Sequence, residues 1–259
     1  MSAMIEVLKH DAIWELRFSR PPVNAISPEF ATTLRDLIRR APAEGARAIV
    51  LSGQPNMFSA GLDVVSLLKL DRNGTLQFWR DFFDLMASIA RCPVPVVAAI
   101  TGHSPAGGAV LAIFCDYRVM AASADPAKPF RIGLNEVQVG LTVPAVIQEA
   151  FGRLIGKYRA ERLMVQGAMI TAEEAVQIGM VDTLAPVSEV VNTALDWCRR
   201  HLALPPVAMS TTRRIARADL ADLMGDPARF PAEDFVNSWF GDETQATLHA
   251  LVAKLKAKG

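Results

Sequence analysis

The chain has 259 residues, and its 27 Lys and Arg residues balance its 27 Asp and Glu residues, so the formal net charge at pH 7 is zero. This balance excludes the net basic field by which proteins hold nucleic acid or an anionic membrane surface, and we predict neither partner. The length allows one large domain, or a main domain with a smaller appendage, built around a sizeable core.

Predicted strands and helices alternate as far as residue 187, and only helices follow. The predicted strands are residues 4–8 and 13–18, forming an antiparallel hairpin with His10 in its turn, then 46–51, a run that begins at Val94, 117–122 and 180–184. Helical spacing and capping residues predict helices at 28–40, from Asp63 onward, and at 75–91, 144–156, 157–166 and between a capping box at Thr171 and Gly179. The helices predicted beyond residue 187 are 188–202, 206–224 and 231–256, with turns at Pro205, Gly225-Asp226 and Gly241.

This order predicts an α/β protein with a core at residues 1–187 and a helical region at 188–259. A doubly wound nucleotide-binding fold is the obvious alternative. The chain has no G-x-G-x-x-G after its first strand and no G-x-x-x-x-G-K-[ST], so it offers neither phosphate loop.

The cysteines and the N-terminus indicate where the protein resides. Cys92, Cys115 and Cys198 are far apart in apolar runs, which favours reduced packing residues over a disulfide framework or a metal site. The N-terminus has no basic leader, and no apolar run approaches the roughly 20 residues that span a membrane. We therefore expect a cytoplasmic protein.

Two predicted strand–loop–helix units leave backbone N–H groups unpaired. The loops are residues 58–63, Phe-Ser-Ala-Gly-Leu-Asp, and residues 102–108, Gly-His-Ser-Pro-Ala-Gly-Gly. The start of a helix favours negative charge because its first N–H groups have no partner within the helix. Donors from two loops would hold a developing oxyanion from two directions, each contributing up to about 3–4 kcal/mol at the transition state.

The second loop also approximates a nucleophile elbow, G-x-S-x-G, with Ser104 as the nucleophile. In that elbow the residue after the serine donates its backbone N–H to the oxyanion hole, and here that residue is Pro105, which has none. We therefore favour a loop hydroxyl bonded to nearby backbone. His103 is likewise predicted to pack within the loop.

Glu136 is the candidate general base. It lies among Leu134, Val137 and Val139, and apolar surroundings raise the pKa of a carboxyl group toward the value that suits proton abstraction from carbon. On local sequence alone, an exposed or ion-paired glutamate beside a strand is the simpler interpretation.

Four ordered motifs carry a family resemblance. Residues 58–63, 102–108, 115–118 (Cys-Asp-Tyr-Arg) and 133–136 (Gly-Leu-Asn-Glu) resemble the crotonase, or enoyl-CoA hydratase/isomerase, superfamily in order and spacing. The resemblance implies a crotonase-like spiral of repeated ββα units with a C-terminal helical trimerisation region, forming a homotrimer or a dimer of trimers. It also implies an acyl-CoA thioester as substrate, with no further cofactor and no metal.

The resemblance assigns roles to particular positions. The two N–H groups that hold the thioester oxygen in that family map onto Leu62 and Gly107, and Glu136 onto a catalytic carboxylate. The substrate-binding positions implied in this way are Ser59, Ala60, Gly61, Leu62, Asp63, Gly107, Gly108 and Asn135.

The catalytic side chains narrow the reaction. Hydratases of the family use two glutamates, and the first of these positions is Val110 here, which leaves Glu136 alone. The segment at 133–140 is especially similar to mitochondrial-type 3-enoyl-CoA to 2-enoyl-CoA isomerases (dodecenoyl-CoA isomerase), which implies that Glu136 moves a proton from C2 to C4 in fatty-acid β-oxidation.

Two other kinds of function remain open. One is a different acyl-CoA chemistry of the superfamily: thioester hydrolysis, decarboxylation or weak hydration. The other is a non-catalytic acyl-CoA-binding or RNA-binding protein. RNA binding is disfavoured because basic residues such as Arg213, Arg214 and Arg217 are interleaved with Asp219 and Asp222.

Overall fold

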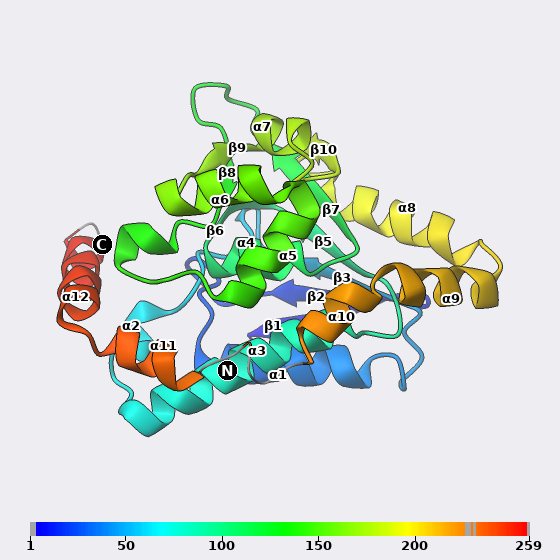
Figure 1. Ribbon diagram of the computed structural model, residues 1–259. Coiled ribbons are helices and arrows are strands. Elements are labelled where there is room, and N and C mark those ends of the chain that lie inside the picture. The colour runs from blue at the N-terminus through cyan, green and yellow to red at the C-terminus, as the bar shows by residue number, and fades with distance from the viewer. Residues whose placement is uncertain (1–3, 226–228, 230–231, 258–259) are drawn as a thin grey trace.

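Two sheets of mostly parallel strands lie at the centre of the molecule in the computed structural model, which describes residues 4–225, 229 and 232–257 (Figure 1). The larger sheet has the order β1-β2-β3-β5-β7-β10, with β1 and β2 antiparallel and the other pairs parallel. Its strands are β1 Ile5–His10, β2 Ile13–Phe18, β3 Ala48–Ser52, β5 Val96–Ile100, β7 Tyr117–Ala122 and β10 Thr183–Pro186. The smaller sheet, in the order β4-β6-β8-β9, consists of β4 Asn56–Met57, β6 Gly102–Pro105, β8 Arg131–Gly133 and β9 Ile170–Thr171.

The chain winds as a spiral of ββα units. Each of β3, β5 and β7 in the larger sheet is followed by a short strand of the smaller sheet and then by helix. The helices are α1 Pro28–Arg40, α2 Val64–Leu67, α3 Arg72–Ala90, α4 Gly107–Ile113, the 3-10 helix η1 Glu136–Val139, α5 Ala145–Ile155, α6 Lys157–Gln166, α7 Ala172–Gln177, α8 Val190–Leu202, α9 Pro206–Ala216, α10 Ala218–Leu223, α11 Ala232–Trp239 and α12 Asp242–Lys256. The predicted α/β spiral of ββα units is confirmed, and the trimer stays a prediction.

Local capping explains where several helices begin. The Ser27 side chain accepts a hydrogen bond from the N–H of Phe30 at 3.2 Å, and Pro28 occupies the first turn of α1, as predicted. Thr171 and Glu174 form the predicted reciprocal capping box of α7.

Four local predictions were wrong. Residues 102–105 form the short strand β6 within the predicted tight loop, because they pair with β4 and β8. His10 ends β1 and contacts the Glu15 carboxylate at 2.9 Å instead of forming the turn.

The last strand begins at Thr183 because the N–H groups of residues 180 and 181 bond to Ala175 O. The predicted helix 206–224 is broken at Arg217, whose φ is −112° and whose guanidinium donates to Phe114 O at 2.7 Å. Asp226 and Pro231, predicted as part of a turn and as a helix start, lie outside the described residues.

The helices beyond residue 187 pack on the spiral in different places. Helix α8 lies against β3, β5 and β7, whereas α11 packs on α3 and α12 contacts η1 and α2. The Trp79 ring lies 5.6 Å from that of Phe235 and 6.5 Å from that of Trp239, so an aromatic cluster joins α11 to α3. The division between residues 187 and 188 stays a prediction.

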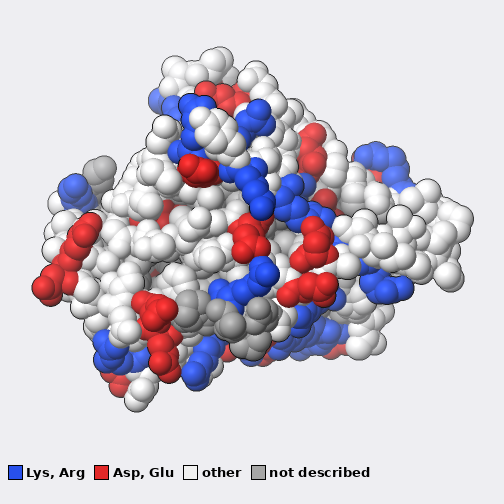
Figure 2. Space-filling view, in the orientation of Figure 1, with Lys and Arg blue, Asp and Glu red and all other residues white. Residues whose placement is uncertain are grey.

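The surface carries charges of both signs, and the cysteines are buried and free, as the composition and spacing predict. On the face in Figure 2, Lys and Arg side chains are interspersed with Asp and Glu side chains. The three cysteines are buried free thiols, and burial raises the pKa of Cys92 to about 11 and those of Cys115 and Cys198 to about 12. Within the described residues, no helix has both the length and the apolar character to cross a bilayer, and no cluster of three metal-ligating side chains occurs.

A nearly buried ion cluster fastens α9 to the sheet. Both Asp116 oxygens accept from Arg213 at 2.7 Å, and Arg217 lies 3.4 Å from the same carboxylate. Asp116 also accepts from the N–H of Val96 in β5 at 2.9 Å. The side chains of Asp116, Arg213 and Arg217 are 9%, 13% and 12% exposed, so the carboxylate compensates two cations that have little access to water.

We expect Asp116→Asn to lower the free energy of unfolding by about 3–5 kcal/mol, because it leaves nearly buried guanidinium groups without their counter-charge. The matched control is Asp219→Asn, whose carboxylate pairs with Arg153 but is 61% exposed, so it should change stability by no more than about 1 kcal/mol. Urea unfolding of the three proteins measures this. Equal effects of the two substitutions would contradict the role given to the buried cluster.

Candidate active site

A cavity of about 450 Å³ lies between the loops that precede α2 and α4, the 3-10 helix η1 and the C-terminal helix α12. Most of its lining is apolar, and the aromatic rings of Trp79 and Phe82 come from α3. The titratable side chains among its described lining residues are Arg20, Asp63 and Glu136. An apolar cavity with a few converging polar groups is typical of a small-molecule site.

The loop 58–63 is held by the extended segment before α1. The N–H of Ala60 donates to Val23 O at 2.9 Å, that of Gly61 donates to the Ser59 hydroxyl at 3.2 Å, and that of Asp63 donates to Ile26 O at 3.0 Å. The N–H of Leu62 donates to no described residue, and Leu62 lines the cavity. The loop therefore presents one unused backbone donor there.

The turn between β6 and α4 supplies a second donor. The N–H of Ala106 donates to Gly133 O at 2.8 Å, whereas Gly107, the first residue of α4, lines the cavity and donates to no described residue. Ala106 has φ 45° and ψ −120°, a conformation that L-residues rarely adopt. Such strain costs on the order of 1–3 kcal/mol and is often found at functional sites.

The two loops touch through glycines. Gly61 has φ +86°, and a Cβ there would lie 3.1 Å from the backbone nitrogen of Gly107. A Cβ on Gly108 would lie 2.6 Å from Ser59 O. Larger residues would force the loops apart, so glycine allows the close approach of the two loops whose unused N–H groups belong to cavity-lining residues.

Glu136 projects from the start of η1 and is 8% exposed. Its Oε2 atom is buried and has no hydrogen-bond partner among the described residues. Burial raises the pKa of Glu136 from its ordinary 4.5 to about 7. A carboxyl group that ionises near neutrality can both take and return a proton, as a general base for carbon requires.

Asp63, the other cavity carboxylate, is already engaged. Its Oδ2 accepts from Arg20 at 2.5 Å and from the Ser66 hydroxyl at 2.6 Å, and it caps α2 through the N–H of Ser66. Burial acts to raise the pKa of Asp63, but the hydrogen bonds from Ser66 and Arg20 outweigh it, so the net pKa lies below the ordinary value. Asp63 therefore stays charged and paired, which leaves Glu136 as the cavity carboxyl group free to exchange a proton.

The structure brings together six of the nine residues predicted for the site. They line one cavity: Ala60, Leu62, Asp63, Gly107, Asn135 and Glu136. The other three, Ser59, Gly61 and Gly108, are buried and do not line the cavity. They hold the loops in place: the Ser59 hydroxyl donates to Asn24 O at 2.7 Å, and the two glycines allow the close approach described above. Val110, at the position where hydratases of the predicted family carry the first of their two glutamates, also lines the cavity.

Ser104 and His103, the two side chains of the second loop that were considered for chemistry, do not line this cavity. Ser104 is fully buried on β6, and its hydroxyl has no hydrogen-bond partner among the described residues, so the predicted bond to nearby backbone was wrong. The Ser104 hydroxyl lies against Gly108, where an added Cβ would come within 2.9 Å of it. His103 lies on β6 and packs against the segment at 130–131 instead of within the loop: its Nδ1 accepts from the N–H of Arg131 at 3.2 Å, and its ring meets Phe130 edge-on.

Several lining residues were missed from the sequence. Trp79 and Phe82 form one wall, and their helical spacing in the sequence fits core packing equally well. Arg20 lies in the segment that connects a predicted strand to a predicted helix, and a cation in such a connection is the one signal that could have indicated it. Leu251 and Leu255 reach the cavity from α12, and no local pattern indicates such a long-range contact.

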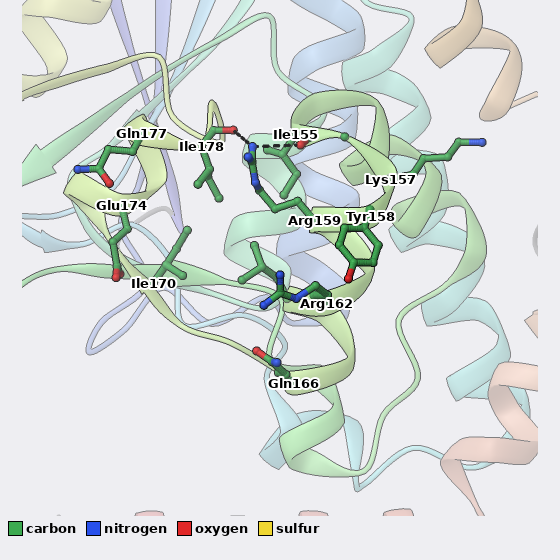
Figure 3. A pocket seen from close by; sticks show the side chains of 12 residues that line it. Ile155, Lys157, Tyr158, Arg159, Arg162, Gln166, Ile170, Glu174, Gln177 and Ile178 are labelled. Atoms are coloured by element: carbon green, nitrogen blue, oxygen red, sulfur yellow. Dashed lines mark hydrogen bonds between the residues drawn. The ribbon is translucent and has the colours of Figure 1, made fainter.

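A second cavity, of about 630 Å³ between α6 and α7, lacks these features (Figure 3). Arg159 donates to the carbonyls of Ile155 and Ile178 at 3.5 and 3.4 Å, and Lys157 points away from the other side chains. Its carboxylate, Glu174, belongs to the capping box of α7. Among its described lining residues, none pairs a free carboxylate with unused backbone donors, so the candidate chemistry belongs to the cavity at Glu136.

Comparisons with known proteins identify the family of the chain. The family model described as Enoyl-CoA hydratase/isomerase matches residues 9–258. Human mitochondrial enoyl-CoA delta isomerase 1 is 30% identical over 243 residues, which are 93% of this chain and 79% of the relative. A putative enoyl-CoA hydratase of Thermus thermophilus is 31% identical over 220 residues, 83% of each protein. The crystal structure of human mitochondrial delta3-delta2-enoyl-CoA isomerase matches with a TM-score of 0.91 at 29% identity, over 99% of each chain. The predicted resemblance is confirmed.

The burial of Glu136 generates a stability prediction. Its folded pKa of about 7 exceeds the ordinary 4.5, so the folded protein binds this proton more tightly than the unfolded chain and loses stability as pH rises between these values. Above pH 7 the full difference corresponds to on the order of 3 kcal/mol. We expect Glu136→Gln to be more stable than wild type by that amount at pH 8, and by less than about 1 kcal/mol at pH 5.

Urea unfolding at the two pH values measures the difference, with Glu161→Gln on the exposed side of α6 as the control. The control should change stability equally at both pH values. A Glu136→Gln effect that is the same at pH 5 and pH 8 would show that the carboxyl group is not desolvated.

Proposed function

The chain belongs to the enoyl-CoA hydratase/isomerase family, and from that premise we propose that it is an isomerase that converts a 3-enoyl-CoA, cis or trans, to the trans-2-enoyl-CoA. The observation that carries the proposal is the pairing of one desolvated carboxyl group, Glu136, with two unused backbone donors in a cavity whose other carboxylate is held by Arg20. One base that both removes and returns a proton suffices for a double-bond shift.

The reaction needs two proton transfers. The Glu136 carboxylate removes a proton from C2 of the 3-enoyl thioester. The electron pair of that C–H bond forms a C1–C2 double bond, and the π pair of the carbonyl moves onto its oxygen, giving a dienolate that keeps the C3–C4 double bond. The N–H groups of Leu62 and Gly107 stabilise its oxygen, each by up to about 3–4 kcal/mol. Protonated Glu136 then delivers the proton to C4, the C2–C3 double bond forms, and the base is regenerated.

Hydration is the competing chemistry that most needs to be separated from isomerisation, because a relative named a putative enoyl-CoA hydratase has similar identity. Addition of water calls for a group that activates water beside the one that handles the carbon-bound proton. Val110 stands where hydratases of the family carry their first glutamate, and its apolar side chain lines the cavity. Thioester hydrolysis and decarboxylation are further alternatives, and their products differ.

The rest of the proposal carries over the expectations from the sequence. The loop 58–63 with Gly107, Gly108 and Asn135 binds the thioester, and Ser59, Gly61 and Gly108 act by shaping the backbone. Coenzyme A belongs to the substrate, so the reaction as written uses no separate cofactor. A homotrimer or dimer of trimers and a cytoplasmic location complete the proposal; light scattering measures the first and fractionation of the source cells the second.

We expect wild type to convert a medium-chain 3-enoyl-CoA to the 2-enoyl-CoA of equal mass, and Glu136→Gln to lose at least about 100-fold in kcat, since a positioned general base contributes 10²–10⁴-fold. Glu161→Gln, on an exposed face, should keep full activity. Mass spectrometry and the absorbance of the conjugated thioester identify the product. Release of free CoA, gain of water or loss of carbon dioxide would each assign a different reaction, and an active Glu136→Gln variant would remove this residue from the mechanism.

The pH dependence of kcat/KM should follow the ionisation of Glu136 in the free enzyme. Only the carboxylate accepts the C2 proton, so kcat/KM should be half-maximal near pH 7, where burial places the pKa of Glu136. It should fall about tenfold per pH unit below that value and level off above it, without a second limb, because the same group returns the proton. A half-maximal value near 4.5, the ordinary pKa, would contradict a desolvated base.

A further inference from the structure

The 3-10 helix that carries Glu136 is held from two sides. On one side, the Gln138 side chain donates to Gly167 O at the end of α6, at 2.9 Å. On the other, the Thr244 hydroxyl of α12 donates to Gly140 O at 2.7 Å. The contact with α12 joins segments 104 residues apart in the sequence, so the position of η1 depends on the C-terminal helix.

The carbonyl that Thr244 holds belongs to the turn that closes on Glu136. Gly140 ends η1 with φ +72°, and its N–H donates to Val137 O at 3.3 Å. The next N–H, that of Leu141, donates to the main-chain oxygen of Glu136 at 3.0 Å. Gly140 O and the N–H of Leu141 belong to the same peptide group. Fixing Gly140 O therefore also fixes the hydrogen bond from Leu141 to the backbone of Glu136, from which the Glu136 side chain projects.

The close approach of α12 leaves little freedom at this turn. A Cβ added to Gly140 would lie 3.2 Å from the Cα of Thr244 and 3.4 Å from the Cβ of Thr247. Thr244 is 5% exposed, so its hydrogen bond is shielded from competing water.

The same face of α12 forms a wall of the cavity. Thr244 and the fully buried Leu248 are one turn apart, and Leu251 and Leu255 continue the stripe at helical spacing and line the cavity. A single rigid element therefore contacts both the turn that carries the base and the space that the acyl group would occupy.

We propose that Thr244 is a positioning residue for Glu136: its hydrogen bond to Gly140 O ties η1 to α12 and so fixes the distance between the carboxylate and an acyl group held against Leu251. The inference rests on the proposed function for its catalytic consequence. Thr244 itself touches no reacting atom.

The neighbouring charges do not account for the ionisation of Glu136. The elements packed on η1 are α12, which carries Asp242, Glu243, His249, Lys254 and Lys256, and α6, which carries Lys157, Tyr158, Arg159, Glu161 and Arg162. The other charged side chains that line the cavity are the Arg20–Asp63 pair. Burial raises the pKa of Glu136, and none of these side chains is among its causes. If η1 is released and water reaches the carboxylate, the pKa must therefore fall.

The test uses Thr244→Val, which keeps the shape of the side chain and removes the donor, and Thr244→Ser, which keeps the donor. Thr247→Val on the same helix is the matched control, since the Thr247 hydroxyl bonds to Glu243 O within α12 at 2.8 Å. We expect Thr244→Val to lower kcat by about tenfold or more, as loss of positioning can, with KM changed less than about threefold and the half-maximal pH of kcat/KM lowered. Thr244→Ser should restore both, and Thr247→Val should behave as wild type.

Three results would overturn the inference: a Thr244→Val protein of lower Tm with unchanged kcat and pH profile, a Thr244→Ser protein as impaired as Thr244→Val, or a Thr247→Val protein impaired to the same degree. If Thr244→Val does not fold, Thr244→Ala replaces it. If wild type leaves 3-enoyl-CoA unchanged, the proposed function fails by itself. In that case the pKa of Glu136 is measured directly. The infrared band of its carboxyl group, identified by subtracting the spectrum of the Glu136→Gln protein, is followed over pH in wild type and in Thr244→Val. A lowered pKa supports the positioning role, and an unchanged pKa overturns it.

Discussion

The site depends on the way backbone hydrogen bonds are distributed in the loop 58–63. The segment before α1 accepts from Ala60 and Asp63, and Ser59 accepts from Gly61, so the N–H of Leu62 is left without a described partner. Backbone donors that are buried are almost always paired, so an unused donor beside a cavity indicates a ligand atom. The contact of Gly61 with Gly107 brings the loop with a second such donor close to it. This geometry is fixed by main chain, so the side chains around it are free to differ between relatives that carry out different chemistry.

Two features of the cavity destabilise the fold and serve this arrangement. Ala106 adopts a backbone conformation at φ 45° that glycine would adopt without strain, and Glu136 is buried with one oxygen unpaired among the described residues. Each is unfavourable by on the order of 1–3 kcal/mol. The packing of α12 on η1 is a contact that reaches far along the chain and holds the element that carries Glu136. Strain and unpaired groups that persist in a well-packed core indicate a functional requirement.

Local elements could be predicted from the sequence because their causes are local. Ser27 and Thr171 cap the helices that follow them, and the apolar runs form strands, as predicted. The family resemblance identified Glu136, whereas its neighbours alone favoured an exposed or paired glutamate. Glu136 is buried where η1 meets α12 and the two loops, and these elements are distant from η1 in sequence. For the same reason, the break at Arg217 and the contributions of Leu251 and Leu255 could not be predicted, since each depends on a contact with another part of the fold.

The C-terminal helix connects these observations. A base placed on a single turn of 3-10 helix has little intrinsic rigidity, because such helices are short and their hydrogen bonds are poorly aligned. Proton transfer between two carbons requires the carboxyl group to reach both C2 and C4, so its position must be fixed relative to the acyl chain as well as to the oxyanion donors. The loops carry the proposed oxyanion donors, and α12 both lines the cavity and contacts Gly140. Helix α12 therefore links one wall of the cavity to the turn that carries the proposed base.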